Sequence, residues 1–256
     1  MSGLALKISG YTAPAELNLP KLYKDAVIDT GSVYAYDSST PESWESQANA
    51  SIGSELINLV DGGANGIFTA NTPFLTGSGF QFTVTGGQRI KLPEAAKLTG
   101  YDGCFATGVW IKVGSQTQTN NSVFGWYNAA GGGYGLRHTT GGSHQAICGD
   151  KFASVPAPAS GIRQVVIARV KDASGNYFAA FYRNGVRIGL QAMTATMVQP
   201  STPPADAALG DVASTGDAGT WIGSIGRSWF TRKDFTVEEM DAKVLKDYNM
   251  NKDFYI

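Results

Sequence analysis

Bulky hydrophobic residues alternate along residues 162–190, and the alternation predicts three antiparallel strands. The segments IRQVVIARV, YFAAFYR and VRIGL are separated by KDASGN and by Asn184-Gly185. Asn-Gly is typical of a type I′ hairpin turn, because both central residues of that turn need a positive φ. Phe181 and Tyr182 are neighbours in the middle strand and point to opposite faces of it. We therefore expect other parts of the protein to cover both faces of this strand.

Short strands of the same kind are expected along most of residues 54–231. The segments GFQFTVTGGQRIKL, CFATGVWIKV, NSVFGWYN, YGLRH, SHQAIC and TWIGSIGRSWF follow one another with Gly-rich or Asn-rich turns between them. Many short strands with a turn every 8–12 residues indicate an all-β sandwich or jelly roll. Residues 195–219 carry Pro, Ala, Gly and Ser without periodicity, and we expect a long surface loop there.

One helix is predicted, over residues 236–249. Thr236 and Glu239 have the spacing of a capping box at a helix N-terminus. Hydrophobic residues then recur at helical spacing, at Val237, Met240, Val244 and Tyr248. This stripe predicts a helix that lies on the sandwich.

Residues 1–53 differ from the rest of the chain, and we expect them to form an extended anchoring arm. Prolines interrupt a set of scattered apolar residues, which are Leu17, Leu19, Leu22, Tyr23, Tyr34 and Tyr36. Such residues can grip a neighbouring molecule. The alternative is that the segment supplies edge strands to the sandwich. On the first interpretation the arm is followed by a sandwich domain at residues 54–256.

Composition argues against some classes of partner. Charged residues are 16 % of the chain, against about 25 % in an average soluble domain, and the net charge is −1. Without clustered Lys and Arg we expect no nucleic-acid binding. No apolar run is long enough to span a membrane, and the start of the chain lacks the features of a signal peptide. Cys104 and Cys148 lie in apolar runs, and we expect two buried thiols.

The order of these segments resembles the concanavalin A-like lectin/glucanase superfamily, in particular its laminin-G-like branch. The similar pieces span about Ser54 to Asn249: FATGVWIKV with Trp110, SVFGWYN, GGYGLRH, RQVVIARVKDASGNYFAAFYRNGVRIG, TWIGSIG and DFTVEEMDAKVLKDYN. Arg163 and Gln164 stand where the family usually has a tryptophan. The resemblance implies an antiparallel jelly roll with an N-terminal arm and a short C-terminal helix.

Single-copy laminin-G-like chains of this size look most like bacteriophage virion proteins. The resemblance therefore implies a non-enzymatic structural protein of the particle, as a capsid decoration, neck or tail component. Its partners would be other virion proteins and further copies of itself, and its location would be the virion, assembled in the host cytoplasm. The glucanases of the superfamily use carboxylates spaced E-x-D-x-E on one strand, and no strand here carries that spacing. We expect no enzymatic activity.

The alternative function is that of a carbohydrate-binding lectin or a receptor-binding adhesin of a phage tail. Sugar binding needs an aromatic surface and a few rigid polar groups. Residues of these types border the GGG turn, namely Trp126, Asn128, Tyr134, Arg137 and His138. Trp126 and Tyr127 are adjacent, so one of the two is expected in the core. The ligand would be a glycan on the host surface.

Two further groups of residues can be considered as metal sites. Calcium is common among relatives of the fold, and loop aspartates that could hold it are Asp102, Asp150, Asp172, Asp206, Asp211 and Asp217. His138 and His144 flank a TTGG turn and would lie nearly opposite each other in a regular hairpin. Two imidazoles can begin a zinc or nickel site, but no third ligand is evident in the sequence. We expect no cofactor, and two half-exposed histidines near a hairpin tip.

Overall fold

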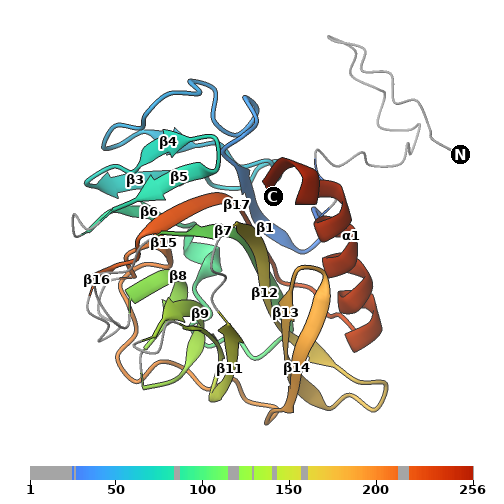
Figure 1. The fold of residues 1–256 in the computed structure, drawn as a ribbon. Coiled ribbons are helices and arrows are strands. Elements are labelled where there is room, and N and C mark those ends of the chain that lie inside the picture. The colour runs from blue at the N-terminus through green and yellow to red at the C-terminus, as the bar shows by residue number, and fades with distance from the viewer. Residues whose placement is uncertain are drawn as a thin grey trace, which may run out of the picture.

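The computed structural model describes residues 25, 27–83, 87–114, 121–128, 130–139, 143–156, 161–212 and 219–255. Figure 1 shows two stacked β-sheets with one helix, α1 (Val237–Tyr255), lying on the outside of one of them. The expected all-β sandwich with a C-terminal helix is confirmed. No helix in the described part of the chain is both long and apolar enough to cross a membrane.

We call the sheet that carries α1 the helix-side sheet. Among the described residues it has eight strands. In hydrogen-bonding order they are β14 (Val186–Ala192), β13 (Tyr177–Arg183), β12 (Ile162–Lys171), β7 (Phe105–Val113), β17 (Gly223–Thr231), β5 (Gly79–Phe82) and β4 (Phe74–Thr76), with β1 (Ser32–Asp37) also paired to β17.

The second sheet has nine strands in the described ranges. Its order is β11 (Lys151–Pro156), β10 (Ser143–Cys148), β9 (Gly133–His138), β8 (Asn121–Tyr127), β15 (Ala208–Gly210), β6 (Arg89–Lys91), β3 (Gly66–Ala70) and β2 (Glu55–Leu56), and β16 (Gly219–Thr220) pairs with β8. That last pair is parallel, and the others are antiparallel. A short 3₁₀ turn, η2 (Glu94–Ala96), follows β6.

The three-strand prediction for residues 162–190 is confirmed as β12, β13 and β14. Asn184 and Gly185 have φ values of 49° and 79°, as the type I′ turn requires. Phe181 packs in the core between the sheets, whereas Tyr182 packs in a second cluster with Met240 and Val244 of α1. The middle strand is thus covered on both faces, by the second sheet on one side and by α1 on the other.

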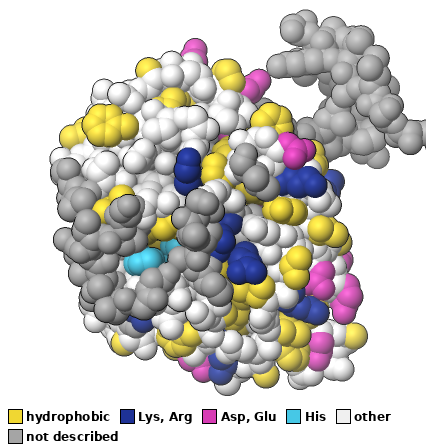
Figure 2. Space-filling model, viewed as in Figure 1, with side chains coloured by type: hydrophobic (Ala, Val, Ile, Leu, Met, Phe, Trp, Pro, Cys, Tyr) yellow, Lys and Arg dark blue, Asp and Glu magenta, His cyan; other side chains and the backbone are white. Residues whose placement is uncertain are grey.

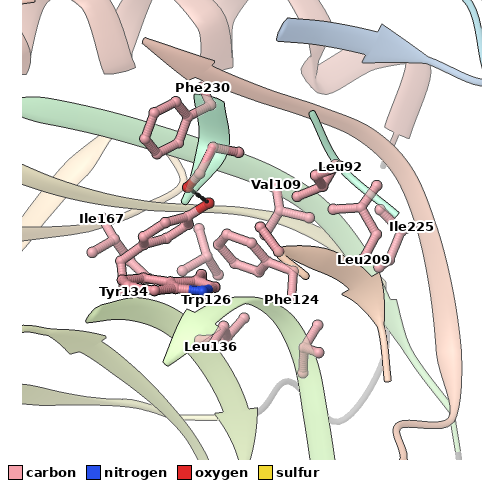
Figure 3. Packing of buried hydrophobic residues seen from close by; sticks show 14 of the residues in the cluster. Leu92, Val109, Phe124, Trp126, Tyr134, Leu136, Ile167, Leu209, Ile225 and Phe230 are labelled. Carbon is pink, nitrogen blue, oxygen red and sulfur yellow. Dashed lines mark hydrogen bonds between the residues drawn. The ribbon is translucent and has the colours of Figure 1, made fainter. Parts of the chain in front are cut away.

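Most of the apolar interior lies between the two sheets. Figure 3 shows Phe124, Trp126 and Tyr134 of the second sheet facing Val109, Ile167 and Phe230 of the helix-side sheet. Cys104 and Cys148 are buried free thiols, as expected. Burial raises the pKa of the Cys148 thiol to about 12, so this sulfur behaves as a small apolar group.

The arm prediction is wrong for Tyr34 and Tyr36. Both lie in β1, which pairs with β17, and they are 0 % and 1 % exposed. The Tyr34 hydroxyl hydrogen-bonds with Ser228 Oγ at 3.2 Å, and the two tyrosine rings stack with centres 4.8 Å apart. The alternative, a strand supplied to the sandwich, holds for residues 32–37. The other expected anchors, Leu17, Leu19, Leu22 and Tyr23, lie outside the described residues.

Two boundaries also differ from the sequence-based expectations. Residues 208–210 lie in the expected surface loop, yet they form the buried strand β15 between β6 and β8. Three residues are too few to show a period. Helix α1 begins with the predicted capping box, in which the Thr236 amide donates to Glu239 Oε2 at 2.9 Å and the Glu239 amide to Thr236 Oγ1 at 3.2 Å. The helix continues six residues beyond 249, because Tyr255 is buried against Trp110 and donates to Asp37 Oδ1 at 2.5 Å.

A buried ionic cluster joins α1 to the helix-side sheet. Arg227 of β17 is 1 % exposed and contacts the carboxylates of Asp25 at 2.5 Å, Asp37 at 3.3 Å and Asp247 at 3.2 Å. Burial disfavours the charge on Arg227, but the three carboxylates outweigh it and hold its pKa above the ordinary value. We call Arg227, Asp25, Asp37 and Asp247 the Arg227 cluster.

Asp247 accepts further hydrogen bonds at the centre of this cluster. Its Oδ2 accepts from the indole nitrogens of Trp110 at 3.1 Å and Trp229 at 3.3 Å, and from Gln164 Nε2 at 2.7 Å. A carboxylate with no exposed surface is stable only if its charge and lone pairs are satisfied in this way. The cluster therefore fixes how α1 crosses β7, β12 and β17.

We expect Asp247→Ala to lower the free energy of unfolding by about 3–5 kcal/mol, because it leaves the buried Arg227 charge partly uncompensated. The control is Asp234→Ala, which removes an ion pair to Lys171 whose side chains are 67 % and 30 % exposed. That change should cost about 0–1 kcal/mol. Urea unfolding followed by tryptophan fluorescence measures both, and equal losses in the two variants would contradict this account.

Burial raises the pKa of the Tyr34 phenol from 10.0 to about 12. Above pH 10 the unfolded chain therefore releases a proton that the folded protein keeps, and the free energy of unfolding falls as the pH rises, by about 1.4 kcal/mol per pH unit for one such group. We expect Tyr34→Phe to make the alkaline loss of stability less steep by about this amount. Urea unfolding between pH 8 and 11 measures it. Phe124→Leu, a core change without a titrating group, should lower stability without altering the slope.

Candidate functional site

The residues expected to form a sugar site around the GGG turn are not brought together on a surface. Trp126 and Tyr134 are 2 % and 0 % exposed and lie in the core (Figure 3). Their polar atoms are satisfied internally, since Trp126 Nε1 donates to the Pro204 carbonyl at 3.1 Å and Tyr134 Oη to the Ala96 carbonyl at 2.9 Å. Tyr127 is also buried, on the opposite face. The expectation that Trp126 and Tyr134 would stack on a sugar is wrong.

Asn128 and Arg137 have local roles instead. Asn128 Oδ1 accepts from the Ala130 amide at 2.8 Å and so stabilises the turn after β8. Arg137 Nε donates to Gln145 Oε1 at 2.9 Å across β9 and β10. Arg137 follows Leu136, which faces the core, so its side chain lies on the outer face of the second sheet. His138, the next residue, faces inward. Of the five expected residues, Trp126, Tyr134 and His138 therefore point into the core, Arg137 points outward, and Asn128 lies in the turn after β8.

His138 and His144 lie opposite each other in β9 and β10, as expected from the hairpin pattern. They are not half-exposed, however, since the exposed fractions are 6 % and 0 %. Their rings meet edge to face with centres 5.3 Å apart. Burial lowers the pKa of His144 to about 3, with further lowering by His138 and Arg163, and burial also lowers the pKa of His138. Both imidazoles are therefore neutral at pH 7. Histidine atoms are visible on the face of the molecule drawn in Figure 2.

The loop aspartates considered for calcium do not gather. The described residues contain no group of three or more His, Cys, Asp or Glu side chains placed to hold a metal ion. Four of the carboxylates have local partners: Asp102 accepts from the Met197 amide, Asp172 from the amides of its own turn, and Asp150 and Asp206 pair with lysines. The Asp211 amide donates to the Gln88 carbonyl at 3.1 Å, and Asp217 lies outside the described residues.

The structure instead assembles a row of side chains on the outer face of the helix-side sheet. Phe74 pairs with Gln81, Gln81 with Ser224, and Ser224 with Lys112. Directly paired residues lie on the same face of a sheet, and Lys112 shares its face with Trp110, which packs under α1. The row therefore crosses β4, β5, β17 and β7 on the outer face, over about 14 Å. We call these four residues the outer-face row.

A pocket of about 260 Å³ lies along the outer-face row. It is lined by Thr76, Ser78, Gln81, Lys112, Val113, Gly114, Gly223 and Ser224. Phe74, 56 % exposed, stands beside Gln81 at the edge of the sheet. Ligand pockets are commonly about 300–1,000 Å³, so this one suits a small ligand or one end of a longer one.

Internal hydrogen bonds fix the turn at one side of the pocket, and two other polar side chains of the lining are free to bind a ligand. Thr76 Oγ1 donates to the Gly79 carbonyl at 2.8 Å and accepts from the Ser78 amide at 3.2 Å, which fixes the turn between β4 and β5. Across the described ranges, Gln81 and Lys112 make no side-chain hydrogen bond or ion pair. Their amide and ammonium groups can therefore meet a ligand without breaking an internal bond.

The lining of the pocket carries several polar groups that can form hydrogen bonds. Its side chains offer hydroxyl groups, an amide and an ammonium group. The exposed ring of Phe74 lies outside this lining, on the strand next to Gln81. None of the described lining residues is Asp, Glu, His or Cys. No local sequence pattern indicates this row, because its members come from four strands and meet only through the register of the sheet.

No protein-family model matches the chain, and no curated protein matches it. Among solved structures, a mutant of Trypanosoma rangeli sialidase displaying trans-sialidase activity is similar with a TM-score of 0.61 at 12 % identity, over 89 % of this chain and 34 % of that one. Trypanosoma rangeli sialidase in complex with sialic acid has a TM-score of 0.59, with the same identity and coverage.

The chain spans about a third of those sialidase chains, and at this identity the likeness concerns the fold alone. The Ruminococcus gnavus IT-sialidase CBM40 overlaps 63 % of this chain and 95 % of that one, at 17 % identity and a TM-score of 0.46. This overlap is too weak to support an argument about function.

Proposed function

We propose that this protein is a carbohydrate-binding β-sandwich of the concanavalin A-like, laminin-G-like class, and that its sugar site is the outer-face row with the adjoining pocket. The observation that carries the proposal is the row itself. An exposed aromatic ring, a free amide, a hydroxyl group and an ammonium group stand in one line on a rigid sheet. A sugar presents an apolar C–H face beside several hydroxyl groups, and this combination complements it.

Three members of the row would contact different parts of the glycan. The ring of Phe74 would pack against the C–H face of one sugar unit. Gln81 can both donate and accept hydrogen bonds, which suits a pair of vicinal hydroxyl groups. Lys112 is the only charged side chain among the described residues that line the pocket. Its ammonium group favours a glycan that carries a carboxylate near the Val113 end of the pocket.

The role in a bacteriophage particle stays a prediction from the sequence resemblance. A glycan-binding sandwich on a capsid or tail would be compatible with it. The residues that would anchor such a protein are Leu17, Leu19, Leu22 and Tyr23, and they lie outside the described residues. Tyr34 and Tyr36 belong to the core and cannot serve as anchors. Contacts with other virion proteins, self-association and virion location likewise stay predictions.

Binding to a glycan array with neutral and carboxylated oligosaccharides, followed by calorimetry on the best ligand, tests the proposal. We expect Phe74→Ala and Gln81→Ala each to weaken binding about tenfold, equivalent to about 1.4 kcal/mol. Lys112→Met should weaken binding of carboxylated glycans more than binding of neutral ones, because it removes only the charge-assisted contact.

The matched control is Phe254→Ala, which removes an aromatic ring that is 74 % exposed near the end of α1, outside the outer-face row. It should leave glycan affinity unchanged. Affinity that is equal in the wild type and in all three row variants would place any glycan elsewhere. Absence of binding to every glycan on the array would refute carbohydrate recognition altogether.

A further inference from the structure

The interior contains two histidines, His138 and His144, with buried ring nitrogens that lack hydrogen-bond partners. Among the described residues, Nδ1 of His138 and both ring nitrogens of His144 are buried without a hydrogen-bond partner. The indole nitrogen of Trp221 is in the same condition, and its ring centre lies 6.5 Å from that of His144. A buried polar atom without a partner costs free energy, so native proteins nearly always supply one. A cluster of four such atoms therefore indicates that something polar occupies this place.

The register of the second sheet explains why these groups converge. Asn121 of β8 pairs with His138 of β9, which pairs with His144 of β10. His138 shares its face with Tyr134 and Leu136, and His144 shares its face with Ala146 and Cys148, all of which lie in the core between the sheets. Both imidazoles therefore enter the interior side by side at one end of the sandwich.

The separation of the two rings fits a shared metal ion. In a zinc–imidazole bond the Zn–N distance is about 2.0–2.1 Å, which places the metal about 3.2 Å from the ring centre. Two imidazoles on one tetrahedral ion then have ring centres about 5 Å apart. The observed centres are 5.3 Å apart, close to this distance. The rings meet edge to face at 73°, so one of them would turn about its side-chain bonds to direct a nitrogen at the shared ion.

We propose that His138 and His144 bind a late first-row divalent cation such as Zn²⁺ or Ni²⁺, for which imidazole is a preferred ligand. The two side chains occupy two coordination positions and leave the others for water or further donors. The ion would bind one nitrogen of each imidazole. The remaining N–H of His144 and the indole N–H of Trp221 are donors, and water on the ion would be their acceptor. It would also hold β9 and β10 together from the inside of the sandwich. This site lies on the second sheet and is separate from the outer-face row.

Zinc titration of the untagged chain tests the proposal. The sequence contains two histidines, so every imidazole signal in an NMR spectrum belongs to this pair. We expect one equivalent of Zn²⁺ to shift the ring-proton signals of both histidines together. Free Zn²⁺ at about a hundred times the Kd should raise Tm by about 5–10 °C. His138→Phe and His144→Phe should each weaken zinc binding at least about tenfold.

The control variant is Arg137→Ala, which changes the outward-facing neighbour of His138 and should leave zinc affinity unchanged. Imidazole signals that do not move, or a shift of one ring only, would overturn the proposal and leave ordered water as the occupant. Zinc binding of undiminished affinity in the double variant His138→Phe/His144→Phe would overturn it as well. Should a histidine variant fail to fold, the wild-type NMR titration and the Tm shift decide between these outcomes.

Discussion

The buried guanidinium group of Arg227 is the interaction on which the arrangement of this molecule depends most. It lies on β17 between carboxylates from three separate parts of the chain: Asp25, Asp37 of β1 and Asp247 of α1. A charge at this depth cannot be left without its partners, because the desolvation penalty would then go uncompensated. The N-terminal strand and the C-terminal helix are therefore tied to the same point of the helix-side sheet.

The Arg227 cluster also determines which part of the outer face of the helix-side sheet α1 leaves uncovered. Asp247 and Tyr255 hold α1 over Trp110 of β7, and the helix covers the outer face there. Two residues further along β7, Lys112 is exposed, and the outer-face row begins. The candidate sugar site is thus the portion of the face that α1 does not reach. Its rigidity comes from the sheet beneath it, which suits recognition of a small polar ligand.

Two clusters of buried polar groups differ in how many hydrogen-bond partners they have. Asp247 receives hydrogen bonds from two indoles and an amide besides its ion pair, so its burial is fully compensated. The imidazoles of His138 and His144 receive nothing of the kind from the described protein groups. In the Arg227 cluster, the buried polar groups find their partners within the protein. The lack of partners at His138 and His144 is therefore a local feature, and a bound cation would explain it.

The elements that could be predicted from the amino-acid pattern are those with local signals. The Asn184-Gly185 hairpin, the capping box of Thr236 and Glu239 and the alternation in β12 and β13 each depend on residues close together in the chain, and each is confirmed. Long-range strand pairing, by contrast, places Tyr34 and Trp126 in the core and brings Phe74, Gln81, Ser224 and Lys112 into one row. Alternation shows that a strand has two faces, but it does not say which face meets the other sheet or which strands become neighbours. Those choices follow from long-range pairing, such as that of β1 with β17, and no local pattern encodes them.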